Sequence, residues 1–148
     1  MRQRRAWLTA GAIIFALQTA ACQRHQVKHE AEQPAEVEEV AGSDVKRVTL
    51  TARAVERIDL KTDSVREERV ARSGSLRKMV PYSALIYDPQ GQTWVYTSPE
   101  PRSFVRQRVV VDYIEGDVAV LNEGPPAGTP VASVGVAELY GTEFGIGH

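Results

Sequence analysis

From residue 45 onward, apolar residues recur at alternate positions in short runs bounded by turn residues. This period of two predicts β-strands, each with one face turned toward a core. We expect strands at 47–50, 79–87, 93–97, 104–114, 118–121 and 130–136, with a polar edge strand at 61–70. No repeat of 20–50 residues is visible, so a repeat architecture is not expected.

One short helix is expected after the first strand. Thr51 can cap it by accepting a backbone N–H bond, and Ala52, Val55 and Ile58 then form an apolar stripe. Such a helix is too short to be stable alone, so it must pack on the sheet. The segment Asp88–Gly91 has the residues of a type I turn.

The fold class predicted from these elements is mainly β. We expect a small β-barrel or β-roll with one short α-helix, preceded by a signal peptide and a disordered tether. A barrel suits many short strands because it leaves few open sheet edges.

The first 21 residues have the pattern of an export signal. Three arginines precede an uncharged stretch at 6–21, which is short for a membrane-spanning helix. Ala20 and Ala21 lead into Cys22, which resembles the bacterial lipoprotein signal, although Thr19 stands where that motif usually has Leu. The resemblance implies that Cys22 is acylated and anchors the chain in a bilayer; a secreted protein with a free thiol and an uncleaved signal anchor are the alternatives.

Residues 22–45 are rich in glutamate and contain Pro34 and Gly42. A segment with so few large apolar residues is predicted to be a flexible acidic linker. The folded domain is therefore expected at 46–148.

Composition narrows the function classes. The 148 residues carry a net charge of -1, with 25% charged and 43% hydrophobic residues. Nucleic acid is not expected as a partner, because binding phosphates requires a basic excess. A single cysteine cannot form an intrachain disulfide.

The sequence contains no catalytic or nucleotide-binding motif of the common types, so we expect neither an enzyme nor a cofactor. His25 and His29 are four residues apart, a spacing that can place two metal ligands on one helix face. The alternative, which we favour, is two solvated side chains in the linker.

Arg102, Arg106 and Arg108 form a basic group, in which Arg106 and Arg108 share a strand face with Phe104. They are candidate contacts for an acidic partner or lipid headgroups; an ordinary exposed strand face is the alternative. Trp94 is expected in the core, since a small domain needs its aromatic residues inside.

Several motifs resemble one family in order and spacing. They are a "V-P-x-S-A" strand with Pro81, Ser83 and Ala84, a "W-V-Y" strand starting at Trp94, and a glycine-containing segment with Gly116, Gly124 and Gly128. Together they resemble the periplasmic adaptor subunits, or membrane fusion proteins, of RND-type tripartite efflux pumps (HlyD-like). Pro125 stands where that family prefers Leu.

The resemblance implies a membrane-proximal β-domain that docks on an inner-membrane RND transporter or on a full-length adaptor. Full-length members insert further domains and a long helical hairpin between the two halves of this region. Here only Glu67–Lys78 lies between them, and Arg72–Ser75 is predicted to be a turn.

We therefore expect a truncated, lipid-anchored adaptor-like component on the periplasmic side of the cell envelope. The inner membrane is favoured, and the absence of Asp after Cys22 leaves the outer membrane open. A periplasmic metal-binding lipoprotein and a degenerate adaptor fragment are the alternatives.

Overall fold

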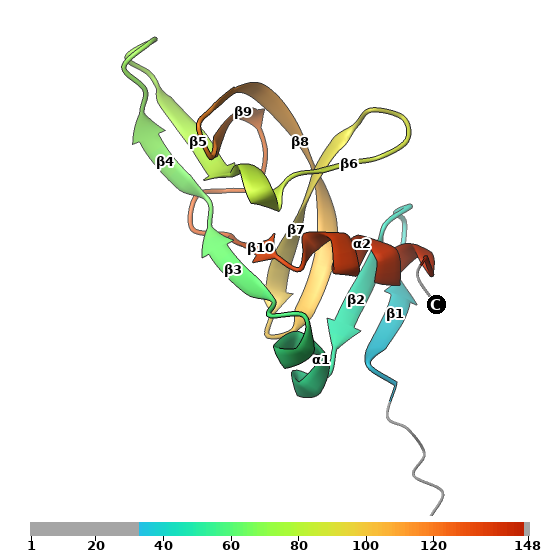
Figure 1. Cartoon of the computed structure of the whole chain (residues 1–148). Coiled ribbons are helices and arrows are strands. Elements are labelled where there is room, and N and C mark those ends of the chain that lie inside the picture. Colours follow the sequence, from blue (N-terminus) through green and yellow to red (C-terminus); the bar gives the residue numbers. More distant parts are fainter. Residues whose placement is uncertain (1–32, 147–148) are drawn as a thin grey trace, which may run out of the picture. The chain divides into compact units, whose positions relative to one another are not determined.

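The computed structural model describes residues 33–146, which form ten strands, two α-helices and one short 3₁₀ helix. In chain order the elements in Figure 1 are β1 (Ala35–Glu39), β2 (Lys46–Leu50), α1 (Ala52–Arg57), β3 (Lys61–Ser64), β4 (Arg66–Arg69), β5 (Leu76–Pro81), η1 (Tyr82–Ala84), β6 (Ile86–Tyr87), β7 (Thr93–Glu100), β8 (Ser103–Glu115), β9 (Val118–Glu123), β10 (Pro130–Val134) and α2 (Val136–Phe144).

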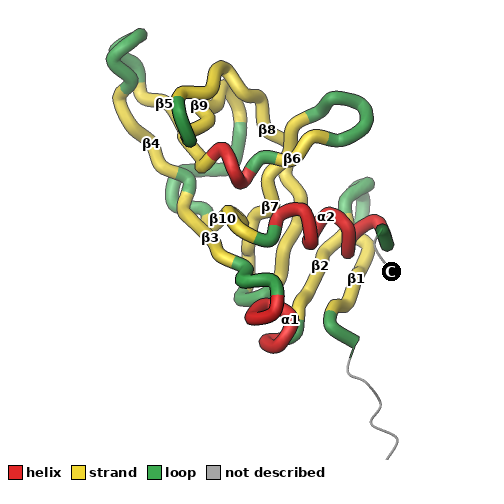
Figure 2. Tube along the Cα trace, in the orientation of Figure 1, coloured by secondary structure: helices red, strands yellow, loops and turns green. Residues whose placement is uncertain are grey.

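The main sheet is antiparallel and nearly closed. Its strand order is β3-β10-β7-β8-β9-β5-β4. The strands at the two ends of this order, β3 and β4, are separated in the chain by Val65 alone, so the chain itself joins the two ends of the sheet. The Val65 N–H donates to the Thr129 carbonyl at 2.9 Å, and Val65 in turn accepts from Gly128 at 2.8 Å. The prediction of a mainly β, barrel-like fold is confirmed, as the strands in Figure 2 show.

Two strands extend this sheet beside the barrel. β2 pairs with the beginning of β8, and β1 pairs with β2. The prediction of a flexible linker throughout 22–45 is wrong for β1. Ala35 and Val37 stand opposite Leu50 and Val48 of β2. Pairing with a core strand therefore orders a glutamate-rich segment that has few large apolar side chains of its own.

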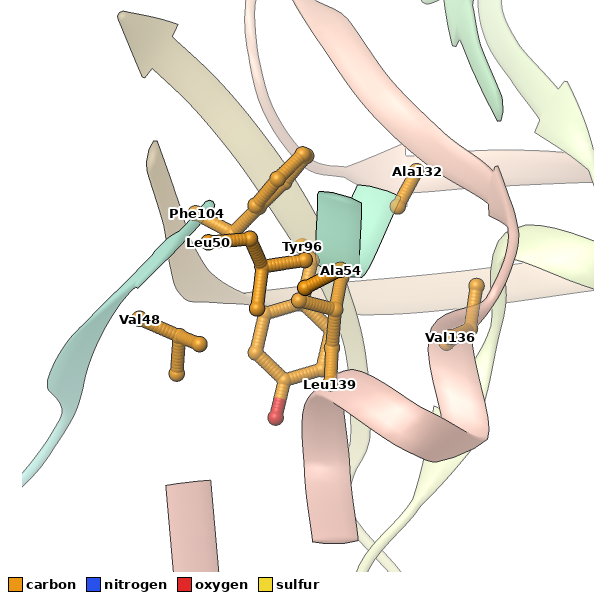
Figure 3. Packing of buried hydrophobic residues seen from close by; sticks show 8 residues of the cluster. All are labelled: Val48, Leu50, Ala54, Tyr96, Phe104, Ala132, Val136 and Leu139. Atoms are coloured by element: carbon orange, nitrogen blue, oxygen red, sulfur yellow. The ribbon is translucent and has the colours of Figure 1, made fainter. Parts of the chain in front are cut away.

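The sheet carries a hydrophobic cluster on each face. The cluster inside the barrel contains the buried residues Val65, Val80, Ala84, Val95, Val109, Ala119, Leu121 and Val131. The second lies between the other face and the two helices, and contains Val48, Leu50, Ala54, Tyr96, Phe104, Ala132, Val136 and Leu139 (Figure 3). Consecutive residues of β7 and β10 enter opposite clusters, so both strands are covered on both faces.

The helix α1 forms where it was predicted, with one difference in its buried face. Thr51 caps it by accepting a hydrogen bond from the Ala54 N–H at 3.2 Å. Ala54 is the buried residue, whereas Ala52 of the predicted stripe is exposed. Val55 and Ile58 pack only partly against the cluster. This six-residue helix therefore buries only Ala54 fully, and Val55 and the C-cap residue Ile58 pack beside it while partly exposed.

The predicted strand 79–87 is interrupted. β5 ends at Pro81, and the 3₁₀ turn η1 follows before the two-residue strand β6. The Tyr82 N–H donates to the Asp117 carbonyl at 2.7 Å, which fixes this 3₁₀ turn against the β8–β9 turn. Pro81 is the last residue of β5 and stands opposite Val118, so it ends the strand rather than beginning it.

The link between β4 and β5 is a tight turn, as predicted. The Val70 N–H donates to the Ser75 carbonyl, and the Gly74 N–H donates to the Val70 carbonyl. The two strands pair directly, with Arg66 opposite Met79. The chain segments on either side of this hairpin therefore belong to one sheet.

Candidate interaction surface

An apolar groove of about 630 Å³ lies between β1, α1 and α2. Its walls carry small and aliphatic side chains, including Ala35, Val37, Ile58, Ala137 and Ile146. Ile146 is 65% exposed at the end of α2. An exposed apolar surface of this kind is typical of interaction sites.

Two glycines fix the C-terminal wall of the groove. The Ile146 N–H donates to the Gly141 carbonyl at 2.7 Å, and a Cβ at position 141 would lie 2.8 Å from the Ile146 carbonyl oxygen. Gly145 ends α2 with φ +65°, the left-handed conformation that favours glycine. The chain can therefore fold back onto α2 only with glycine at position 141.

A buried carboxylate holds α2 on the sheet. Glu143 is 2% exposed and accepts from Arg106 Nε at 3.0 Å and 2.8 Å. It also accepts from the Tyr96 hydroxyl at 2.5 Å and from the Lys46 N–H at 3.3 Å. A buried charge requires such partners, and here they come from β2, β7 and β8.

Two aromatic rings fix the guanidinium of Arg106. Its central carbon lies 4.3 Å from the Trp94 ring centroid and 4.9 Å from that of Phe144. Burial, together with the hydrogen bond to Glu143, raises the pKa of the Tyr96 hydroxyl above its ordinary value. Tyr96 therefore stays protonated and donates to the carboxylate.

Trp94 also joins the turn that precedes β7. Its Nε1 donates to Asp88 Oδ2 at 2.9 Å, and the N–H groups of Gln90 and Gln92 donate to Asp88 Oδ1. Desolvation acts to raise the pKa of Asp88, but these hydrogen bonds outweigh it and lower the pKa below 3.8. The Gly91 N–H donates to the Asp88 carbonyl at 2.9 Å, which is the hydrogen bond of the predicted turn.

The three arginines predicted as one basic group do not act together. Arg106 is 8% exposed and engaged with Glu143, so its predicted role as a partner contact is wrong. The reason is that α2 covers the strand face that Arg106 shares with Phe104. Arg108 is exposed in β8 opposite Trp94, and Arg102 is exposed in the β7–β8 turn with φ 64°.

For most of the residues in the family-like motifs, the structure explains the residue type. Ala84 is fully buried in the barrel, whereas Ser83 is exposed. Gly116 has φ +61° in the two-residue turn between β8 and β9. A Cβ at Gly124 would lie 2.8 Å from Leu121 Cδ1, so a larger residue there would have to displace this side chain. Gly128 has φ +85°.

The predicted lipidation site Cys22 and the candidate metal ligands His25 and His29 lie outside the described residues. Within residues 33–146, no group of three or more His, Cys, Asp or Glu side chains is arranged to hold a metal ion. Neither described helix has the length and hydrophobicity needed to cross a bilayer.

The sequence-based interpretation missed Glu143 and the helix that carries it. Val136, Leu139 and Glu143 are the buried positions of α2, spaced as one helix face. This spacing was available in the sequence, but the glutamate looked like a surface residue because its partner Arg106 is 37 positions away.

Comparison with known proteins gives no match: no protein-family model, curated protein or solved structure is similar to this chain.

Proposed function

We propose that the protein is a non-enzymatic, lipid-anchored component of an RND efflux system in the cell envelope. Its β-domain docks on the periplasmic part of the inner-membrane transporter or on a full-length adaptor. Because the chain has only the β4–β5 hairpin where full-length adaptors insert a helical arm, it assists or modulates a complete adaptor rather than reaching the outer membrane.

The pairing of the two motif-bearing segments carries this proposal. The strand–helix–strand segment 48–65 resembles the opening piece of the adaptor domain, and the motifs from Val80 onward resemble its second half, so the two segments must meet in space. Strands of the first segment pair with strands of the second, since β2 pairs with β8 and β3 pairs with β10. The resemblance requires this pairing, and two segments lying apart would have contradicted it.

The docking test is co-purification of the tagged full-length protein from membranes. We expect the transporter to be recovered under conditions that retain a full-length adaptor. Recovery of no transporter subunit under those conditions would exclude docking.

A matched pair of charge reversals tests Arg108, one of the two exposed arginines that remain candidate contacts. Arg108→Glu reverses an exposed arginine of β8, and Arg66→Glu makes the same change on the exposed strand β4. We expect Arg108→Glu to reduce transporter recovery roughly threefold to tenfold, since charges at the rim of an interface affect association. Equal recovery with both variants would remove Arg108 from the proposed interface.

Anchoring is tested separately at Cys22. An acylated cysteine partitions the protein into membranes, whereas Cys22→Ser leaves no thiol to modify. We expect the variant to leave the membrane fraction and to lose the mass of the acyl chains. If the wild-type protein has the mass of the unmodified chain, Cys22 is not lipidated. That result would not bear on the docking test.

A further inference from the structure

The strand β1 has an open edge. Among the described strands it pairs only with β2, and in Figure 1 it is the outermost strand of that pair. An open edge presents backbone N–H and C=O groups to which another strand can hydrogen-bond.

The hydrogen bonds at the two ends of the β1–β2 pair indicate which backbone groups are free. The Thr51 N–H donates to the Pro34 carbonyl at 3.0 Å, and the Val40 N–H donates to the Val45 carbonyl at 3.3 Å. In an antiparallel pair, hydrogen-bonded positions alternate with positions that point away. The even-numbered residues of β1 therefore bond to β2, and the N–H and C=O groups of Ala35, Val37 and Glu39 point to the open edge.

The side chains of β1 differ on its two faces. Ala35 and Val37 line the apolar groove beneath α2. Glu36 and Glu38 lie on the opposite face and are exposed. Neither carboxylate forms a salt bridge with any residue between 33 and 146.

We propose that β1 accepts an added strand from a partner segment in which apolar and basic residues alternate. The segment hydrogen-bonds to the outward backbone groups of Ala35, Val37 and Glu39. Its apolar side chains extend the groove lining, and its basic side chains lie beside Glu36 and Glu38. This inference goes beyond efflux docking, because it holds for any partner that offers such a segment.

Charge selects this occupant over a second copy of the chain. Pairing β1 with β1 would bring glutamates of two copies onto one face, and like charges on neighbouring strands are destabilising. A basic segment replaces this repulsion with attraction. The same carboxylates protect the edge from unspecific pairing while leaving it open to a basic partner.

The test is amide hydrogen exchange measured by NMR on the full-length protein with two peptides. The probe is Val-Lys-Val-Lys-Val-Lys-Val, and the control is the same peptide with glutamate in place of lysine. We expect the lysine peptide to slow exchange of the amides of Ala35, Val37 and Glu39, and the glutamate peptide to leave them unchanged.

Two variants separate the backbone from the charge contribution. Val37→Pro removes one outward N–H and no bond to β2, as proline permits on an edge, and Val37→Ala is its matched control. We expect the proline variant to lose binding of the lysine peptide and the alanine variant to keep it. The double variant E36K/E38K should weaken that peptide about tenfold and gain binding of the glutamate peptide.

Three outcomes would overturn the proposal. The first is protection of these three amides in the protein alone, which would mean that its own chain or a second copy covers the edge. The second is equal binding of both peptides, and the third is protection that maps to another part of the domain.

Discussion

The two hydrophobic clusters, one on each face of the sheet, are built by different means. The cluster inside the barrel consists of valine, alanine and leucine side chains with no charged member. The cluster under the helices is bordered by the Arg106–Glu143 ion pair. Its largest side chain, Tyr96, links the cluster to this ion pair through a hydrogen bond to Glu143. In Figure 3 the Tyr96 ring lies among the aliphatic side chains of this cluster.

This difference follows from what each cluster must hold in place. Hydrogen-bonded strands enclose the barrel interior, so its geometry is set by the backbone and needs only side chains of the right size. The helix α2 has no ladder to position it on the sheet. The buried carboxylate of Glu143 has partners on three strands, so it specifies one position for α2. In that position α2 forms a wall of the apolar groove.

Breaking the ion pair should have the largest effect. Arg106→Ala leaves Glu143 buried without its charge partner, which costs about 3–5 kcal/mol. A small domain has a free energy of unfolding of about 5–15 kcal/mol, so the variant will be close to unfolding. Urea unfolding followed by circular dichroism measures the loss.

The matched control replaces both charges. In R106M/E143M no unpaired charge remains, so we expect most of the lost stability to return. A loss below about 1 kcal/mol in Arg106→Ala would mean that solvent reaches Glu143 and that the ion pair does not position α2.

Removing the Tyr96 hydroxyl should have the next largest effect. Tyr96→Phe keeps the ring in the cluster but removes the bond to Glu143, and a hydrogen bond to a charged group contributes about 1.5–3 kcal/mol. The variant also changes how stability depends on pH. Because burial raises the pKa of Tyr96, the unfolded chain releases this proton at lower pH than the folded chain. Stability therefore falls as pH rises above about 10.

We expect this fall to be shallower in Tyr96→Phe than in the wild-type protein. The measurement is the free energy of unfolding at several pH values from neutral to alkaline. Parallel curves for the two proteins would contradict a buried, protonated Tyr96.

The two clusters also differed in how well the sequence predicted them. The strands of the barrel follow from alternation of apolar residues, as in Val109 and Val111 of β8, and the turn at Asp88 follows from residue type. β1 could not be predicted in this way, because its order comes from pairing with Val48 and Leu50. The Arg106–Glu143 pair was also beyond prediction, since two distant charged residues give no local signal that they meet.

Overfilling the barrel should have a smaller effect than breaking the ion pair. Gly124→Ala places a Cβ 2.8 Å from Leu121 Cδ1 and 3.3 Å from Val109 Cγ1. We expect a loss of about 1–2 kcal/mol, because the closer contact is the end of a flexible side chain that can shift. Leu121→Val removes that Cδ1, so G124A/L121V should lose less than the sum of the single variants. Additive losses in urea unfolding would exclude this contact as the cause.

The smallest effect is expected at the Asp88 turn, which lies outside both clusters but touches Trp94. The pKa of Asp88 is lowered because hydrogen bonds from Trp94 and two backbone N–H groups outweigh desolvation. Trp94→Phe removes the side-chain bond, so the pKa should rise toward 3.8 while the backbone bonds remain. An NMR titration of the carboxyl resonance measures both proteins. As the pKa is lowered in the folded state, the contribution of Asp88 to stability is present above its unfolded pKa and is lost as pH falls through the folded value. The same pKa in both proteins would mean that the backbone N–H groups alone stabilise the carboxylate, and that Trp94 is fixed by Arg106 rather than by this turn.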